Sequence, residues 1–128
     1  MRQTLHRQLR FTGRGNKGQR MLTSISGLLA ASSWLLLSAI TAMGILLEET
    51  GNATVNVLMA AVFGLTGVFL LWRTRAAATL HRTHPADPVV KMVLRTHLIA
   101  DFAMALLGLA FASAATLRIW HEASPVFG

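Results

Sequence analysis

Three long apolar segments alternate with short polar ones along the chain. Residues 21–47 and 50–72 contain no ionisable side chain, and a third apolar segment, 97–117, is interrupted by Asp101 near its start. A helix needs about 20 residues to cross the hydrocarbon core of a bilayer. The pattern therefore predicts an all-α membrane protein with three transmembrane helices. We place the spans at about residues 22–47, 53–73 and 97–119.

The polar segment between the second and third spans predicts a helical hairpin. Residues 73–83 contain no helix breaker and are rich in alanine, so the second helix should continue to about His84. Pro85 would end it, Asp87 is placed to cap the next helix, and Pro88 suits a first helical position. The two helices should form a long antiparallel hairpin whose closed end projects into the cytoplasm.

The remaining segments are short. Residues 1–11 place leucines on one stripe among arginines, which is typical of a basic interfacial helix, although a disordered tail suits the composition equally well. The glycines of 13–18 predict a flexible linker, 48–52 a tight turn, and the end of the chain a frayed tail. We divide the chain into a basic arm, 1–20, a three-helix bundle, 21–122, and an external tail, 123–128.

The distribution of charge predicts an orientation. The chain is 53% hydrophobic and 13% charged, with a net charge of +7. Basic residues near a span favour the cytoplasmic side, and all but Arg118 either precede the first span or lie between the second and third. We therefore expect the N-terminus in the cytoplasm, the C-terminus outside, and a multi-pass protein of the bacterial inner membrane. Those basic residues are Arg2, Arg7, Arg10, Arg14, Lys17, Arg20, Arg73, Arg75, Arg82, Lys91 and Arg95.

The composition also excludes several classes of protein. Topology accounts for the basic residues, and neither interleaved aromatic residues nor a nucleic-acid-binding motif accompanies them, so we expect no nucleic-acid partner. The chain contains no cysteine, which excludes a disulfide-stapled module and a thiolate metal site.

Small residues recur at helical spacing in each span. Between transmembrane helices such residues mark close backbone approach. They form more small-residue faces than three helices need, which predicts contact with further membrane helices. The predicted packing positions are Gly27, Ala31, Ala60, Gly64, Gly67, Ala105, Gly108 and Ala112.

Aromatic residues mark both the membrane interfaces and one position inside a span. Trp34 lies near the middle of the first span, where its N–H has no water to bond. It should pack against another helix, or face lipid with its N–H bonded to a serine such as Ser33 or Ser38; alternatively it borders a pigment, a quinone or a neighbouring subunit. Three residues fall where the interfaces should lie: Trp72, Arg73 and Trp120.

Asp101 is the acidic residue within a span, and such a residue is a functional candidate by default. It lies four residues after His97, so the two side chains can touch on one helix face. Counted in residues from the hairpin turn, Asp101 and Arg73 lie at nearly the same level along the two helices. We predict an ion pair with Arg73 or His97; a proton-relay or quinone site formed with His97, and a bond to another subunit, are the alternatives.

Five histidines raise the question of a haem or metal site. The hairpin register offsets His81 from His97 along the membrane normal, which excludes haem ligation by this pair within one chain. His81 and His84 lack a third zinc ligand. Phosphate-binding loops, nucleophile elbows and paired-carboxylate sites do not occur, so we predict no enzyme and no cofactor of its own. Contact with the pigment, quinone, haem or lipid of a partner complex stays open, with His97, Asp101 and Trp34 as the candidate residues.

These features favour a non-catalytic accessory subunit of a larger energy-transducing membrane complex, photosynthetic or respiratory. Its partners would be that integral-membrane complex and anionic lipids at the cytoplasmic face. One alternative is a membrane-anchor subunit that holds haem b or a quinone through His97 and Asp101. A second alternative is a holin-like pore.

Overall fold

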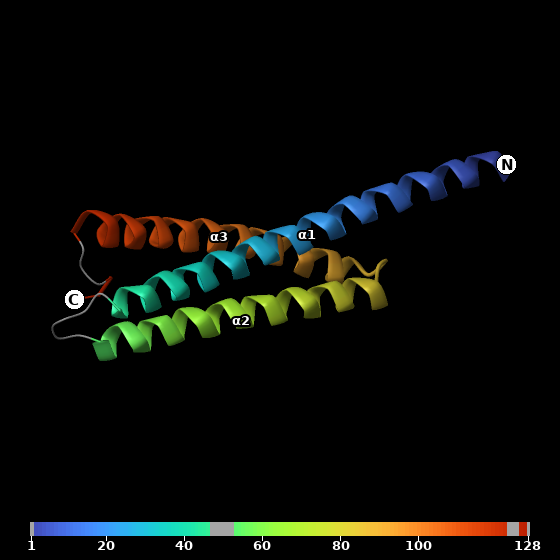
Figure 1. The fold of residues 1–128 in the computed structure, drawn as a ribbon. Helices are drawn as coiled ribbons and strands as arrows, with labels where there is room; N and C mark the ends of the chain where they lie inside the picture. Colours follow the sequence, from blue (N-terminus) through green and yellow to red (C-terminus); the bar gives the residue numbers. More distant parts are fainter. Residues whose placement is uncertain (1, 47–52, 123–125, 128) are drawn as a thin grey trace.

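A computed structural model describes residues 2–46, 53–122 and 126–127, with side chains described from residue 21 onward. It contains three helices, α1 (Arg2–Ile45), α2 (Ala53–Thr83) and α3 (Pro88–Glu122) (Figure 1). The turn predicted at 48–52 lies outside the described residues, as do the side chains of the basic arm.

All three helices are long and apolar enough to cross a membrane, which confirms the predicted fold class. Their outer surfaces carry large apolar side chains, among them Leu65, Phe102 and Leu106, each more than half exposed. A surface of this kind is covered by lipid rather than water. The chain is therefore a multi-pass membrane protein.

The helix α1 lies between α2 and α3 (Figure 1). It packs extensively against both, whereas α2 and α3 make few contacts with each other. The predicted antiparallel hairpin of α2 and α3 is present, but the helices on its two sides do not pack directly against each other. The two helices are joined by a short turn, but α1 holds them apart along most of their length.

The turn itself has the predicted chemistry. Helix α2 ends at Thr83 and α3 begins at Pro88. Between them, the Asp87 carboxylate accepts a hydrogen bond of 2.8 Å from the backbone N–H of Val89, as expected of an N-cap. The proline at the first helical position needs no hydrogen-bond partner there.

Helix α1 continues through the glycine-rich segment 13–18, where a flexible linker was predicted. Each glycine weakens a helix by about 1 kcal/mol relative to alanine, which is far less than proline does. The apolar half of α1 already supplies a helical nucleus, so each further residue only has to extend it. At 44 residues, α1 is about 66 Å long, and its N-terminal part passes beyond the α2–α3 turn (Figure 1).

Glycines allow the close approach of α2 and α3 to α1. A Cβ atom at Gly67 of α2 would lie 2.7 Å from Cγ of Leu35 and 3.2 Å from the carbonyl oxygen of Ala31. A Cβ at Gly108 of α3 would collide with Ser33 on the other side of α1. Small residues therefore line both interfaces of α1, as is usual where lipid rather than water surrounds the helices.

The predicted packing positions lie mostly inside the bundle. Seven of them are buried and one, Gly64, is half-buried beside Ser38. The Ser38 hydroxyl also donates a 2.7 Å hydrogen bond to the carbonyl oxygen of Ala60, which ties α1 to α2. The seven buried positions are Gly27, Ala31, Ala60, Gly67, Ala105, Gly108 and Ala112.

The end of the chain folds back onto the bundle, so the prediction of a frayed tail is wrong for residues 126–127. The Asn56 side chain donates to the carbonyl oxygen of Phe127 at 2.7 Å and accepts from its N–H at 3.1 Å. Arg118 donates to the carbonyl oxygen of Val126 at 3.1 Å. The Phe127 ring lies against Phe63. These contacts satisfy polar backbone groups that would otherwise be exposed to lipid.

Substitution of Gly67 tests the close packing of α1 and α2. We expect Gly67→Ala to lower the free energy of unfolding by about 1–3 kcal/mol, because the new methyl group meets Leu35 and the Ala31 carbonyl. Gly18→Ala is the control, since nothing lies within 4 Å of a Cβ there and alanine favours the helix. Unfolding by SDS in mixed micelles, followed by circular dichroism, measures both. Equal stability of the two variants would contradict the packing described.

Candidate functional site

An ion pair connects α2 and α3 near the end of the bundle that carries their turn. Nη2 of Arg73 lies 2.5 Å from Oδ1 of Asp101. The Asp101 side chain is 5% exposed and that of Arg73 is 23% exposed. The predicted pair between these two residues is thus confirmed, and it bridges two helices that otherwise touch little.

Local sequence brings the two side chains together. Asp101 belongs to the buried stripe of α3, which begins at Val90 and Leu94 and continues through Ala105 and Gly108. Arg73 lies about as far before the turn as Asp101 lies after it, so the antiparallel course of the helices places them at one height. Removing one member of such a pair leaves an uncompensated charge in an apolar environment, which strongly destabilises the folded protein.

His97 lies one turn before Asp101 and interacts with it electrostatically. It is half-buried, and its Nδ1 atom has no hydrogen-bond partner among the described residues. His81 of α2 is 6% exposed, and its Nδ1 likewise lacks a partner there. A carboxylate, a guanidinium and an imidazole can together hold charge and exchange a proton. Over the described parts of the chain, no three histidine or acidic side chains converge as a metal site would require.

Trp34 occupies the centre of the bundle rather than its edge. Its Nε1–H donates a 3.0 Å hydrogen bond to the carbonyl oxygen of Met104 on α3, and its ring lies 5.7 Å from that of Phe63 on α2. The predicted packing against another helix is confirmed, and the alternative, a lipid-facing ring bonded to Ser33 or Ser38, is wrong. Those hydroxyls donate to backbone carbonyls instead, Ser33 to Ala30 and Ser38 to Ala60.

The two remaining tryptophans lie on the outer surface, with Trp72 65% and Trp120 82% exposed. Trp72 lies toward the α2–α3 turn, and Trp120 lies near the last turn of α3 at the opposite end. Amphipathic indole rings are enriched at the two membrane interfaces, and these positions suit that role.

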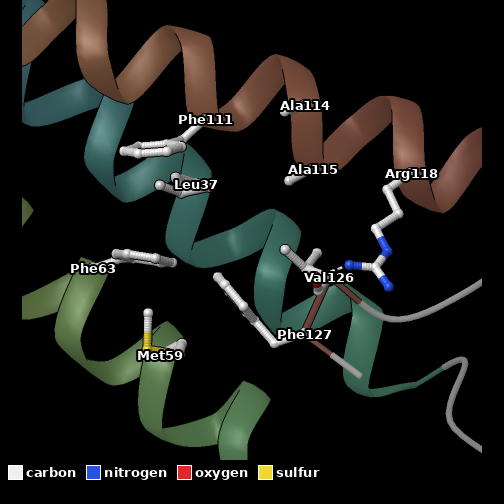
Figure 2. A pocket seen from close by; sticks show the side chains of 9 residues that line it. All are labelled: Leu37, Met59, Phe63, Phe111, Ala114, Ala115, Arg118, Val126 and Phe127. Carbon is white, nitrogen blue, oxygen red and sulfur yellow. Dashed lines mark hydrogen bonds between the residues drawn. The ribbon is translucent and has the colours of Figure 1, made fainter.

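A cleft at the end opposite the turn was not predicted (Figure 2). Phe63 of α2 and Phe111 of α3 face each other across it, Leu37 of α1 forms its floor, and the folded-back Phe127 closes one end. Sequence reasoning missed the cleft because it depends on the folded-back tail. The sequence contains one signal of it, the amide of Asn56 within an apolar segment. In the structure this side chain is fully buried, and a buried amide needs hydrogen-bond partners.

Comparison of the chain with protein-family models, with curated proteins and with solved structures finds no match. Function must therefore be argued from the geometry of this chain.

A double-mutant cycle on the ion pair separates its structural and functional roles. We expect Arg73→Leu alone to destabilise the bundle by about 3–5 kcal/mol, because the buried Asp101 carboxylate loses its partner. Arg73→Leu combined with Asp101→Leu should recover most of that loss, because no charge is then left unpaired. SDS unfolding in mixed micelles measures all variants.

Function in the cell then distinguishes the two roles. If the double variant is as stable as the wild type but cannot replace it in the cell, Asp101 has a functional role beyond the pair. A single variant as stable as the wild type would contradict the structural role.

Proposed function

We propose that the chain is a non-catalytic accessory subunit of a larger bacterial inner-membrane complex that transduces energy, photosynthetic or respiratory. The observation that carries the proposal is the part of α1 that extends beyond the bundle without another element beside it (Figure 1). An isolated helix of this length is marginal in water. A partner protein or a lipid surface would stabilise it.

The charge of this arm indicates what it contacts. Six basic residues precede the first span, and five more lie between the second and third. The positive-inside tendency supports a cytoplasmic location for the arm and for the α2–α3 turn. An acidic cytoplasmic surface of a partner subunit, flanked by anionic headgroups, complements this charge.

The interior of the bundle supports a structural role. Trp34, Ser38, Asn56 and Arg73 all bond to groups elsewhere in the same chain. Such interactions make a rigid three-helix unit. The small-residue faces that suggested further helices are used inside the bundle, so a partner would meet the exposed leucine, valine and phenylalanine side chains and the arm.

A membrane anchor for haem b or a quinone is the second candidate. It is favoured by the buried Nδ1 of His97, which lacks a described partner and lies beside Asp101. A holin-like pore has less support, because Trp34, Ser38 and Arg73 bond to groups inside the bundle rather than line a lumen.

Extraction in mild detergent tests the accessory role. The tagged chain should co-purify with a much larger complex. Arg7→Gln, Arg10→Gln and Arg14→Gln together should reduce that co-purification about tenfold, since each charge contributes about 0.5 kcal/mol to a contact of this kind. The matched control replaces Arg75, Arg82 and Arg95, which are exposed near the turn, with glutamine and should retain the complex.

Two results would decide against the proposal. Migration of the wild-type chain as a free species would contradict an accessory role altogether. A haem absorption band that His97→Ala removes would favour the membrane-anchor alternative.

A further inference from the structure

The cleft between α2 and α3 has the size and the lining of a ligand site. Its volume is about 450 Å³, within the range of roughly 300–1,000 Å³ that is usual for small-molecule sites. It forms where α2 and α3 lie apart on the two sides of α1. Phe111 and Ala114 at its edge are exposed, so the cleft opens to the surface that faces lipid.

One charged residue, Arg118, lines the cleft, and it lies at the depth of a membrane interface. Arg118 is about one turn from the end of α3, close to the exposed Trp120 that suits a membrane interface. Phe111 lies seven residues earlier on the same helix, which is roughly 10 Å deeper. A cation at headgroup depth thus adjoins an apolar groove that leads toward the middle of the bilayer.

The contacts of Arg118 allow its guanidinium to bind an anion in addition to its present partners. Its Nη1 donates to the carbonyl oxygen of Val126, and its Nε lies 3.4 Å from the Glu122 carboxylate. The Glu122 side chain is 62% exposed, and an exposed ion pair of this kind is weak. The bond to Val126 fixes the guanidinium at the mouth of the cleft (Figure 2). A planar guanidinium fixed in this way favours recognition of a phosphate.

We propose that this cleft binds one glycerophospholipid of the adjoining leaflet. One hydrocarbon chain would lie between Phe63 and Phe111, above Leu37, with the phosphate beside Arg118. The folded-back Phe127 closes the groove at the end that carries Arg118, so the hydrocarbon chain enters from the side that faces lipid, past Phe111 and Ala114. The site lies at the end of the bundle opposite the α2–α3 turn, so it is distinct from the Arg73–Asp101 pair and from lipid contacts of the basic arm.

Filling the cleft tests the position of the hydrocarbon chain. The full chain in mild detergent is mixed with phosphatidylglycerol, and bound lipid is counted by native mass spectrometry. Ala114→Leu should reduce the bound fraction about tenfold, because the larger side chain occupies the groove. Ala61→Leu is the matched control: Ala61 is exposed on the side of α2 away from Met59 and Phe63, and the variant should bind as the wild type does.

Changing the ligand and the cation tests the position of the phosphate. The wild type should bind phosphatidylglycerol about tenfold better than diacylglycerol with the same chains, and Arg118→Gln should reduce that ratio to about one. Arg118→Lys keeps a cation and should keep most of the preference. Thermal unfolding of each variant confirms that the bundle is intact.

Equal lipid binding by the wild type and the Ala114→Leu variant would overturn the proposed groove. Equal binding of the two lipids by the wild type would overturn the role of Arg118.

Discussion

The close approach of α2 and α3 to opposite sides of α1 is the constraint on which the rest of the structure depends. Glycines at 67 and 108 leave room for α1 side chains and backbone on its two sides. In a bilayer the hydrophobic effect does not draw helices together, so close packing and interhelical hydrogen bonds must supply the attraction. With α1 in the middle, Trp34 reaches Met104 of α3 while Ser38 reaches Ala60 of α2.

In the same arrangement, polar contacts connect the outer helices at the two ends of the bundle. Where α1 separates α2 from α3, the outer helices are connected at one end by the Arg73–Asp101 pair. At the other end, Asn56 of α2 and Arg118 of α3 hold the folded-back tail between them. An ion pair is tolerated inside the membrane because each member compensates the other's charge. The open cleft is what remains between the outer helices when their ends are connected in this way.

Much of the fold follows from the order of residues along the chain. Span lengths, the Asp87 cap and the height of Asp101 relative to Arg73 are local or follow from one turn, so the sequence predicts them. The arrangement of the helices in space cannot be predicted in this way, because a small residue indicates a close approach but not which helix approaches. The partner of Trp34 and the contacts of Asn56 could not be predicted for the same reason: both depend on which helices become neighbours.

Disulfide trapping tests the central position of α1 most directly, because the chain has no cysteine of its own. A Cβ at position 64 would lie 3.9 Å from that of Ser38, within the range a disulfide needs. Cysteines at 38 and 64 should therefore form a disulfide rapidly under mild oxidation. Cysteines replacing Ala60 and Ala112, which face α1 from opposite sides, should stay reduced. Rapid oxidation of the second pair with none of the first would contradict the account.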